Sequence, residues 1–340
     1  MSAVNTAGQL RRIIGHLSGV LCALSGLLWG QNVSTELKDK SKDLALLTFA
    51  PGGKIRIHPF DGPDVSFCEA DQSLTPYVSQ DGRTILWQTT GSFRLQSVSG
   101  GGSLMQHKSG DPRMSWVVSV PNHPEAFAYA VPSDTPLVDK VIFEATPETA
   151  KLLGWPSPHF EREQHDAWTT PSWSPDGKQL ALGLLDSHST AGGSYVFILL
   201  WNVLSGEGKK VASGVTPVWA PDGQWISYLR SHGPEHQLAG EAHLYQVVTG
   251  RDEKLFEFDN LDVNFPLRWS PDGKYFLYGR IVHETGNTED VIWIYRLHDG
   301  ATTEIFRVPR ETIVNRGPDW ISSWQNLKRT PGPLLRNCEK

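Results

Sequence analysis

The sequence is poor in cysteine and, beyond its first 30 residues, in the apolar stripes that amphipathic helices require. The 340 residues include only three cysteines, Cys22, Cys68 and Cys338, and no Cys-x-x-Cys pair of a structural zinc site. His-Glu-x-x-His and Gly-x-Ser-x-Gly are also absent. The sequence therefore carries neither the zinc-peptidase motif nor the nucleophile elbow of the α/β-hydrolases, and it does not favour a helical fold.

Basic residues do not exceed acidic residues in number. Lys and Arg total 31 against 37 Asp and Glu, which gives a formal net charge of −6 with neutral histidines. Nucleic-acid binding needs a basic patch or stripe. The composition therefore argues against a nucleic acid as partner, while 32 Gly and 23 Pro suit a turn-rich, all-β protein.

One sequence unit recurs in register along the chain. Its copies are TPYVSQDGRTILW from Thr75, TPSWSPDGKQLAL from Thr170, TPVWAPDGQWISY from Thr216 and PLRWSPDGKYFLY from Pro266. The central aspartates are Asp81, Asp176, Asp222 and Asp272, and the gap between the first two holds two periods. A period of about 47 residues is typical of the blades of a β-propeller.

Each unit predicts a β-hairpin. Proline fixes φ at the first turn position, aspartate bonds the backbone two residues later, and glycine takes a left-handed conformation. Residues alternate in polarity after the turn, as they do in a strand. The predicted structural turn residues are Asp81, Gly82, Asp176, Gly177, Asp222, Gly223, Asp272 and Gly273.

These repeats resemble the Trp-Ser-Pro-Asp-Gly signature of the TolB-like, WD-repeat-like β-propeller family. The resemblance extends over residues 43–324 and implies an all-β fold of four-stranded antiparallel blades. The family includes periplasmic scaffolds, and its propellers also occur fused to peptidases and other catalytic domains. The resemblance therefore implies a fold and no single activity.

Six blades are expected, because the first blade lacks an innermost strand that residues 317–321 can supply. Pairing of the N- and C-terminal segments would close the ring and remove exposed edges. A seven-bladed ring is the alternative, and it would need a further unit within residues 146–167. Residues 325–340 are predicted to form an irregular C-terminal tail.

Residues 1–30 are predicted to be a signal peptide or a membrane anchor. Arg11 and Arg12 precede an apolar stretch, residues 13–29, and Gly30 followed by Gln31 offers a cleavage point. Leu28 lies three residues before that point, where a small residue is usual, so an uncleaved tether through residues 13–29 is the alternative. Both predict export, to the periplasm or the medium, or a propeller anchored outside the cytoplasm.

The cysteines left after such a cleavage are Cys68 and Cys338. In an oxidising compartment two remaining cysteines favour a disulfide. These two lie near opposite ends of the folded region, so the bond would close a long loop.

Six histidines are predicted to gather on one face of the propeller, opposite the repeated hairpins. They are His159, His165, His188, His232, His236 and His283. Imidazoles that converge from separate loops could bind a divalent metal ion or perform acid–base chemistry. The alternative is that they are solvated loop residues, since their spacing matches no strong metal motif.

Two functions of different classes follow. The first is an exported, non-enzymatic scaffold without a cofactor that binds a protein or a cell-envelope component through its long-loop face. The second is a metal-dependent lyase or hydrolase, acting on a sugar or small ester, with the six histidines as ligands. A ligand sensor anchored by an uncleaved N-terminal segment is a third possibility.

Overall fold

The computed structural model describes residues 35–39, 43–50, 54–69, 75–89, 91–98, 103–108, 111–134, 138–165, 171–186, 195–232, 239–258, 267–284, 287–309, 319–322, 325, 329 and 335–337. The predicted signal peptide or anchor, residues 1–30, lies outside the described residues. None of the helices within the described ranges is long and apolar enough to cross a membrane.

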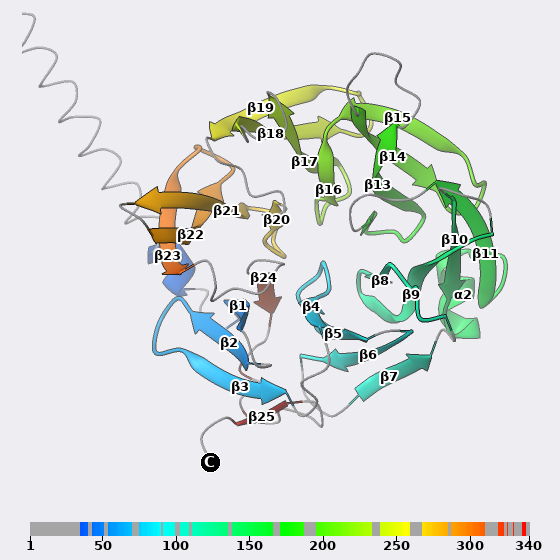
Figure 1. Ribbon diagram of the computed structural model, residues 1–340, viewed down its shortest axis with the longest axis horizontal. Coiled ribbons are helices and arrows are strands. Elements are labelled where there is room, and N and C mark those ends of the chain that lie inside the picture. The colour runs from blue at the N-terminus through cyan, green and yellow to red at the C-terminus, as the bar shows by residue number, and fades with distance from the viewer. Residues whose placement is uncertain are drawn as a thin grey trace, which may run out of the picture.

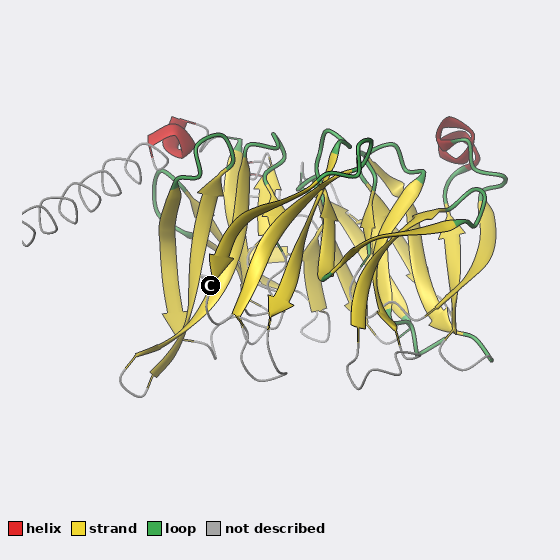
Figure 2. Cartoon of the chain, turned by 90° about the horizontal axis from the view of Figure 1, so that it is seen from above, coloured by secondary structure: helices red, strands yellow, loops and turns green. Residues whose placement is uncertain are grey.

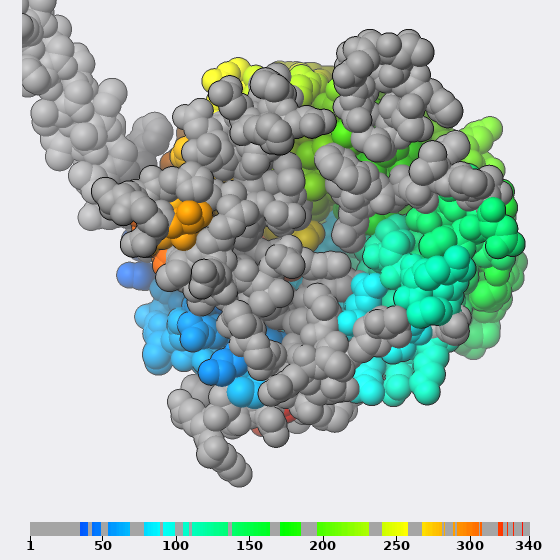
Figure 3. Space-filling view, viewed as in Figure 1, coloured from blue at the N-terminus to red at the C-terminus, as the bar shows by residue number. Residues whose placement is uncertain are grey.

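Six antiparallel sheets stand in a ring, as the sequence predicts (Figure 1). Blade 1 contains β24 (Asp319–Ser322), β1 (Leu44–Ala50), β2 (Lys54–Pro59) and β3 (Val65–Glu69); blade 2 contains β4 (Thr75–Val78), β5 (Thr84–Thr89), β6 (Ser92–Ser97) and β7 (Ser103–Lys108); blade 3 contains β8 (Trp116–Val120), β9 (His123–Pro132), β10 (Val138–Glu144) and β11 (His159–His165). On the face shown in Figure 3, blade 1, in blue, lies beside the last blade of the chain, residues 268–309, in orange.

The other three blades follow in chain order. Blade 4 contains β12 (Ser172–Trp173), β13 (Gln179–Asp186), β14 (Tyr195–Asn202) and β15 (Gly208–Ser213); blade 5 contains β16 (Val215–Trp219), β17 (Trp225–His232), β18 (Ala239–Gln246) and β19 (Asp252–Phe258); blade 6 contains β20 (Arg268–Trp269), β21 (Tyr275–Glu284), β22 (Asn287–Arg296) and β23 (Thr302–Pro309). The seven-bladed alternative is wrong, because residues 146–167 hold the short helix α2 (Pro147–Leu153) and β11 instead of a further blade.

Blade 1 combines strands from both ends of the sequence. Its innermost strand, β24, pairs antiparallel with β1, with Trp320 opposite Leu46. On its outer edge β25 (Leu335–Asn337) pairs with β3, so blade 1 has a fifth strand. The segment 325–340, predicted to be an irregular tail, thus contains a short ordered strand.

One side of the ring carries the turns between the first and second strands of each blade and those between the third and fourth; we call it the hairpin face. The two kinds of turn are bonded together, for example Val98 N to Arg83 O at 2.8 Å and Val247 N to Gln224 O at 2.9 Å. Helix α2 lies on the same side, as does the helical segment 35–39 (Figure 2). The opposite side, the loop face, receives the connections from second to third strands and between blades.

The repeated turns have the chemistry that the sequence predicts. Gly82, Gly177, Gly223 and Gly273 all have φ between +66° and +71°. Asp176 accepts hydrogen bonds from Ser174 Oγ at 2.6 Å and from the Lys178 backbone N–H at 3.2 Å, and equivalent backbone bonds reach Asp81, Asp222 and Asp272. In blade 3, where the signature is degenerate, Asn122 takes the left-handed conformation instead, with φ 61°.

Tryptophans join neighbouring blades near the channel. The indole N–H of Trp173 donates to Val118 O of blade 3, and that of Trp269 donates to Val218 O of blade 5. Trp320 donates in the same way to Arg268 O. These three rings are 1–5% exposed, so each fills the wedge between two sheets while its indole N–H is bonded.

Candidate functional site

His159 and His165 lie at opposite ends of one strand. His159 begins β11 opposite Glu144, and His165 ends it opposite Val138, so about 20 Å separates them at the rise of a strand. Because β10 and β11 are joined on the hairpin face through α2, His159 lies on that face. This corrects the predicted histidine set, since these two residues cannot bind the same metal ion.

The other predicted ligands are only partly described. His232 ends β17 and His283 lies near the end of β21, but their side chains and that of His165 lie outside the described residues, as do His188 and His236 entirely. The part of the chain that the structure describes holds no group of three His, Cys, Asp or Glu side chains able to bind a metal ion. A metal site formed by the remaining histidines stays a prediction.

Cys68, in β3, is disulfide-bonded. Its predicted partner Cys338 lies outside the described residues. In the ladder between β3 and β25, Arg336 lies opposite Cys68, so the chain reaches the neighbourhood of Cys68 two residues before Cys338.

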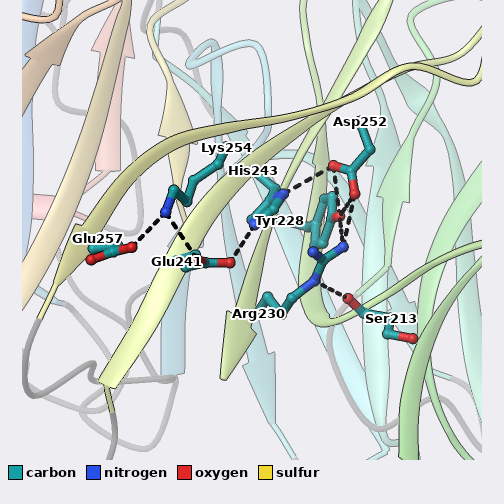
Figure 4. Close-up of polar contacts among 8 residues, drawn as sticks. All are labelled: Ser213, Tyr228, Arg230, Glu241, His243, Asp252, Lys254 and Glu257. Carbon is teal, nitrogen blue, oxygen red and sulfur yellow. Dashed lines mark hydrogen bonds and ion pairs between the residues drawn. The ribbon is translucent and has the colours of Figure 1, made fainter. Parts of the chain in front are cut away.

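A dense polar cluster lies on blade 5 (Figure 4). We call it the blade 5 cluster, and it consists of Tyr228 and Arg230 on β17, Glu241 and His243 on β18, and Asp252 and Lys254 on β19. Alternate residues of a strand point to the same side, so each strand presents two of these side chains together. A bulge between Ala242 and His243 shifts the register with β19.

His243 is the buried centre of this cluster, with a side chain only 6% exposed. Its Nε2 lies 2.8 Å from Glu241 Oε2 and its Nδ1 lies 3.0 Å from Asp252 Oδ1. Ionised carboxylates only accept hydrogen bonds. Both contacts are therefore hydrogen bonds at once only when both ring nitrogens of His243 carry protons.

Asp252 accepts hydrogen bonds from three side chains of the cluster, His243, Tyr228 and Arg230. Tyr228 Oη donates to it at 2.9 Å and Arg230 Nη2 at 2.8 Å. Partial burial alone would raise the pKa of Asp252, but the bonds from His243, Tyr228 and Arg230 hold this pKa below its usual value. Burial and the Asp252 carboxylate in turn raise the pKa of the Tyr228 phenol.

One further contact links this network to blade 4, and another lies within blade 5. Arg230 Nε donates to Ser213 O on the outer strand of blade 4, at 3.3 Å. Lys254 Nζ lies 3.3 Å from Glu241 Oε1. Within the described residues, no serine or cysteine side chain bonds to His243, so the cluster lacks the nucleophile–base pair of an acyl-transfer site. Its geometry is that of an ionic network within blade 5 that one hydrogen bond, from Arg230 to Ser213 O, links to blade 4.

A smaller cluster joins blades 2 and 3 in a similar way. His107 Nδ1 lies 3.3 Å from Glu144 Oε2, and its Nε2 lies 3.2 Å from Tyr129 Oη. Tyr129 also donates to Glu144 Oε1 at 3.1 Å, and His159 Nδ1 lies 3.5 Å from the same oxygen. This histidine–tyrosine–carboxylate set spans β7 to β11 and braces the second blade junction.

The central channel is narrow at its hairpin end. Gln80, which replaces the proline of the signature, donates from Nε2 to Trp219 O of blade 5 at 2.9 Å and accepts from Ser172 Oγ of blade 4. Beside it, Arg268 Nε and Asp319 Oδ1 form an ion pair at 3.0 Å. The cavity between these groups measures about 20 Å³, which is enough for about one water molecule.

The sequence did not predict the blade 5 cluster, the cluster that joins blades 2 and 3, or the contacts in the channel. Glu241 and His243 alternate with Ala242 and Leu244, which is the pattern of a strand with one solvated side. In the structure, Tyr228, Glu241 and Asp252 surround the histidine on that side. The blade 5 cluster could have been recognised in the sequence from the polar residues at alternate positions of three consecutive strands.

The comparisons with known proteins bear on the fold. No protein-family model matches the chain, and no curated protein does. Among solved structures, TolB from Acinetobacter baumannii is 15% identical with a TM-score of 0.56, and the match covers 82% of this chain and 66% of that one. The chain thus spans about two thirds of that protein's length.

Two further solved structures are less similar. A putative TolB from Agrobacterium tumefaciens is 14% identical, with a TM-score of 0.49 and coverage of 80% of this chain and 91% of that one. An oligogalacturonate lyase in complex with manganese is 12% identical, with a TM-score of 0.43 and 78% of each chain covered. Among these, the structure from Acinetobacter baumannii supports the fold assignment; at 15% identity its likeness shows the fold alone, a β-propeller, as the repeats predict.

Proposed function

We propose that this chain is an exported, non-catalytic β-propeller scaffold that binds a protein or another cell-envelope component through its loop face. The proposal takes its location from the basic and apolar character of residues 11–29. It takes its architecture from the six-bladed ring. The partner remains to be identified by experiment.

The proposal rests mainly on one observation: the described polar side chains make their contacts within the protein. The charged groups of the blade 5 cluster, the junction of blades 2 and 3, and the Arg268–Asp319 pair bond to one another across strands or between blades. Groups used in this way hold the ring rigid. A rigid ring that presents connections at one face is the usual arrangement of a binding scaffold.

The longer connections of the chain attach at the loop face. Residues 187–194 join β13 to β14, residues 233–238 join β17 to β18, and residues 310–318 join β23 to β24. The termini of these strands on the loop face are described, while the connections themselves are not. Their sequences contain charged and polar residues, such as Glu235 and Arg310, suited to recognition of a protein surface.

The test is site-specific photo-crosslinking in intact cells. A photoreactive p-benzoylphenylalanine replaces Glu235 in a loop-face connection, and the matched control replaces Gln224 at the hairpin turn of the same blade. We expect a discrete protein or envelope adduct from position 235 that is absent from position 224. Replacing residues 187–194 by an equally long Gly-Ser segment should reduce it. No adduct at 235, or the same adducts at both positions, would reject the proposal.

A further inference from the structure

The chain enters the propeller on its hairpin face, at the junction of blades 6 and 1. Leu37, in the helical segment 35–39, is fully buried in a cluster with Leu44, Tyr275 and Trp320. Beside it, Glu36 Oε2 lies 3.2 Å from Arg296 Nη1. Arg296 ends β22, directly before a turn of the hairpin face, so these contacts fix the point of entry on that face.

The length of chain before this point is short. Glu36 lies six positions after Gly30, which follows the apolar stretch, and a fully extended chain spans about 20 Å over six positions. If residues 13–29 lie in a membrane, the hairpin face at blades 6 and 1 cannot be farther than this from the membrane surface.

The exposed apolar side chains lie on the same face. Among the described residues, the large hydrophobic side chains that are exposed are Leu152, 71% exposed on α2, and Val248, 89% exposed in the turn between β18 and β19. Lys151 is exposed next to Leu152. Apolar side chains beside a basic one suit contact with the headgroup region of a bilayer.

We propose that residues 13–29 remain in the mature protein as a membrane anchor and that the hairpin face, through Leu152 and Val248, lies against the bilayer surface. Leu28 at the position three before Gln31 supports retention, because signal peptidase sites favour a small residue there. The inference rests on the export assumed in the proposed function. It adds an orientation, in which the loop face is presented to partners away from the membrane.

The first measurement is the mass and N-terminal sequence of the full chain recovered from membranes. Retention predicts a protein that still contains residues 13–29 and stays with the membrane in alkaline carbonate. A mature protein that begins at Gln31 and is released by osmotic shock would overturn the proposal. That result would leave binding through the loop face intact, so the two proposals fail separately.

The second measurement tests the orientation of the retained protein. The full chain is reconstituted in vesicles of phosphatidylethanolamine and phosphatidylglycerol, with p-benzoylphenylalanine in place of Val248. The matched control places the same residue at Asp134, which is exposed at the end of β9 on the loop face. We expect lipid adducts at 248 in several-fold excess over 134, reduced by Leu152→Glu. Equal labelling, or more labelling at 134, would overturn the proposed orientation.

Discussion

At the scale of single residues, the repeated glycines are constrained by more than their backbone angle. A Cβ built on Gly177 would lie 2.9 Å from both Leu153 Cδ2 and Val120 Cγ1, whereas one built on Gly154 meets nothing within 4 Å. The two glycines have similar φ angles, +66° and +71°. They therefore separate the effect of backbone strain from that of packing.

We predict that Gly177→Ala destabilises the protein more than Gly154→Ala. Both variants force alanine into the left-handed region, at about 1–2 kcal/mol each. Gly177→Ala adds overpacking against buried side chains, which typically costs a further 1–3 kcal/mol or so. Urea unfolding followed by tryptophan fluorescence measures the free energy of unfolding of both variants. If Gly177→Ala lowers it no more than Gly154→Ala does, the packing of α2 on this turn is contradicted.

The blade 5 cluster predicts a pH dependence of stability in the acidic range. The folded-state pKa of Asp252 is lowered from its ordinary value. The stabilisation of the folded state by this ionised carboxylate is therefore fully present above the unfolded-state pKa, near 4. That contribution is lost as the pH falls through the lower folded-state pKa. Asp252→Asn should therefore be less stable than the wild type at pH 7, and the difference should shrink below about pH 4.

Unfolding by urea at several pH values between 3 and 7 measures this difference. The groups that face Asp252 are Tyr228 and Arg230 on β17 and His243 on β18, and none of them is changed in the variant. Asp134→Asn on the loop face serves as the control. A constant difference between wild type and Asp252→Asn across the whole pH range would show that Asp252 acts only through packing.

At the scale of elements, β25 fastens the end of the chain to the outer edge of blade 1. It pairs with β3 over Leu335, Arg336 and Asn337, and three residue pairs are a short ladder for independent stability. The disulfide of Cys68 supplies a covalent fastening if Cys338 is its partner. The register between β3 and β25 supports that pairing.

We predict that peptide mapping without reduction recovers a Cys68–Cys338 peptide. Because the bond closes a loop of most of the chain, its removal by Cys338→Ser should destabilise the propeller by about 2–4 kcal/mol. Thermal unfolding with and without a reductant measures the effect, which should vanish in Cys338→Ser. A Cys22–Cys68 peptide would instead place the N-terminal segment beside blade 1.

At the scale of the whole molecule, the ring could be predicted and its internal bracing could not. Turn chemistry is local, so Asp176 and Gly177 reveal a hairpin from a few neighbouring residues. His243 is enclosed by Tyr228 of β17 and Asp252 of β19, and no local pattern records those contacts between strands. His159 was placed on the wrong face because β11, which includes Glu161, Arg162 and Glu163, lacks the residues that favour strands.

The last prediction concerns the dependence of the ring on both ends of the chain. β24 places Ile321 in the core shared by blades 1 and 2 and Trp320 in the core shared with blade 6. A chain that ends at residue 324 keeps this strand and loses β25, whereas one that ends at residue 318 loses both. Removal of β24 would leave β1 with an unpaired edge inside the ring.

We therefore expect the chain ending at 324 to unfold in a single cooperative transition at reduced stability. The chain ending at 318 should lose considerably more than the ~3–5 kcal/mol typical of deleting one buried tryptophan side chain. Its far-ultraviolet circular dichroism and tryptophan fluorescence should no longer change together, because blade 1 would separate from the remaining five blades. Equal unfolding midpoints for the two truncated chains would mean that the propeller holds together without the contribution of its C-terminal strand.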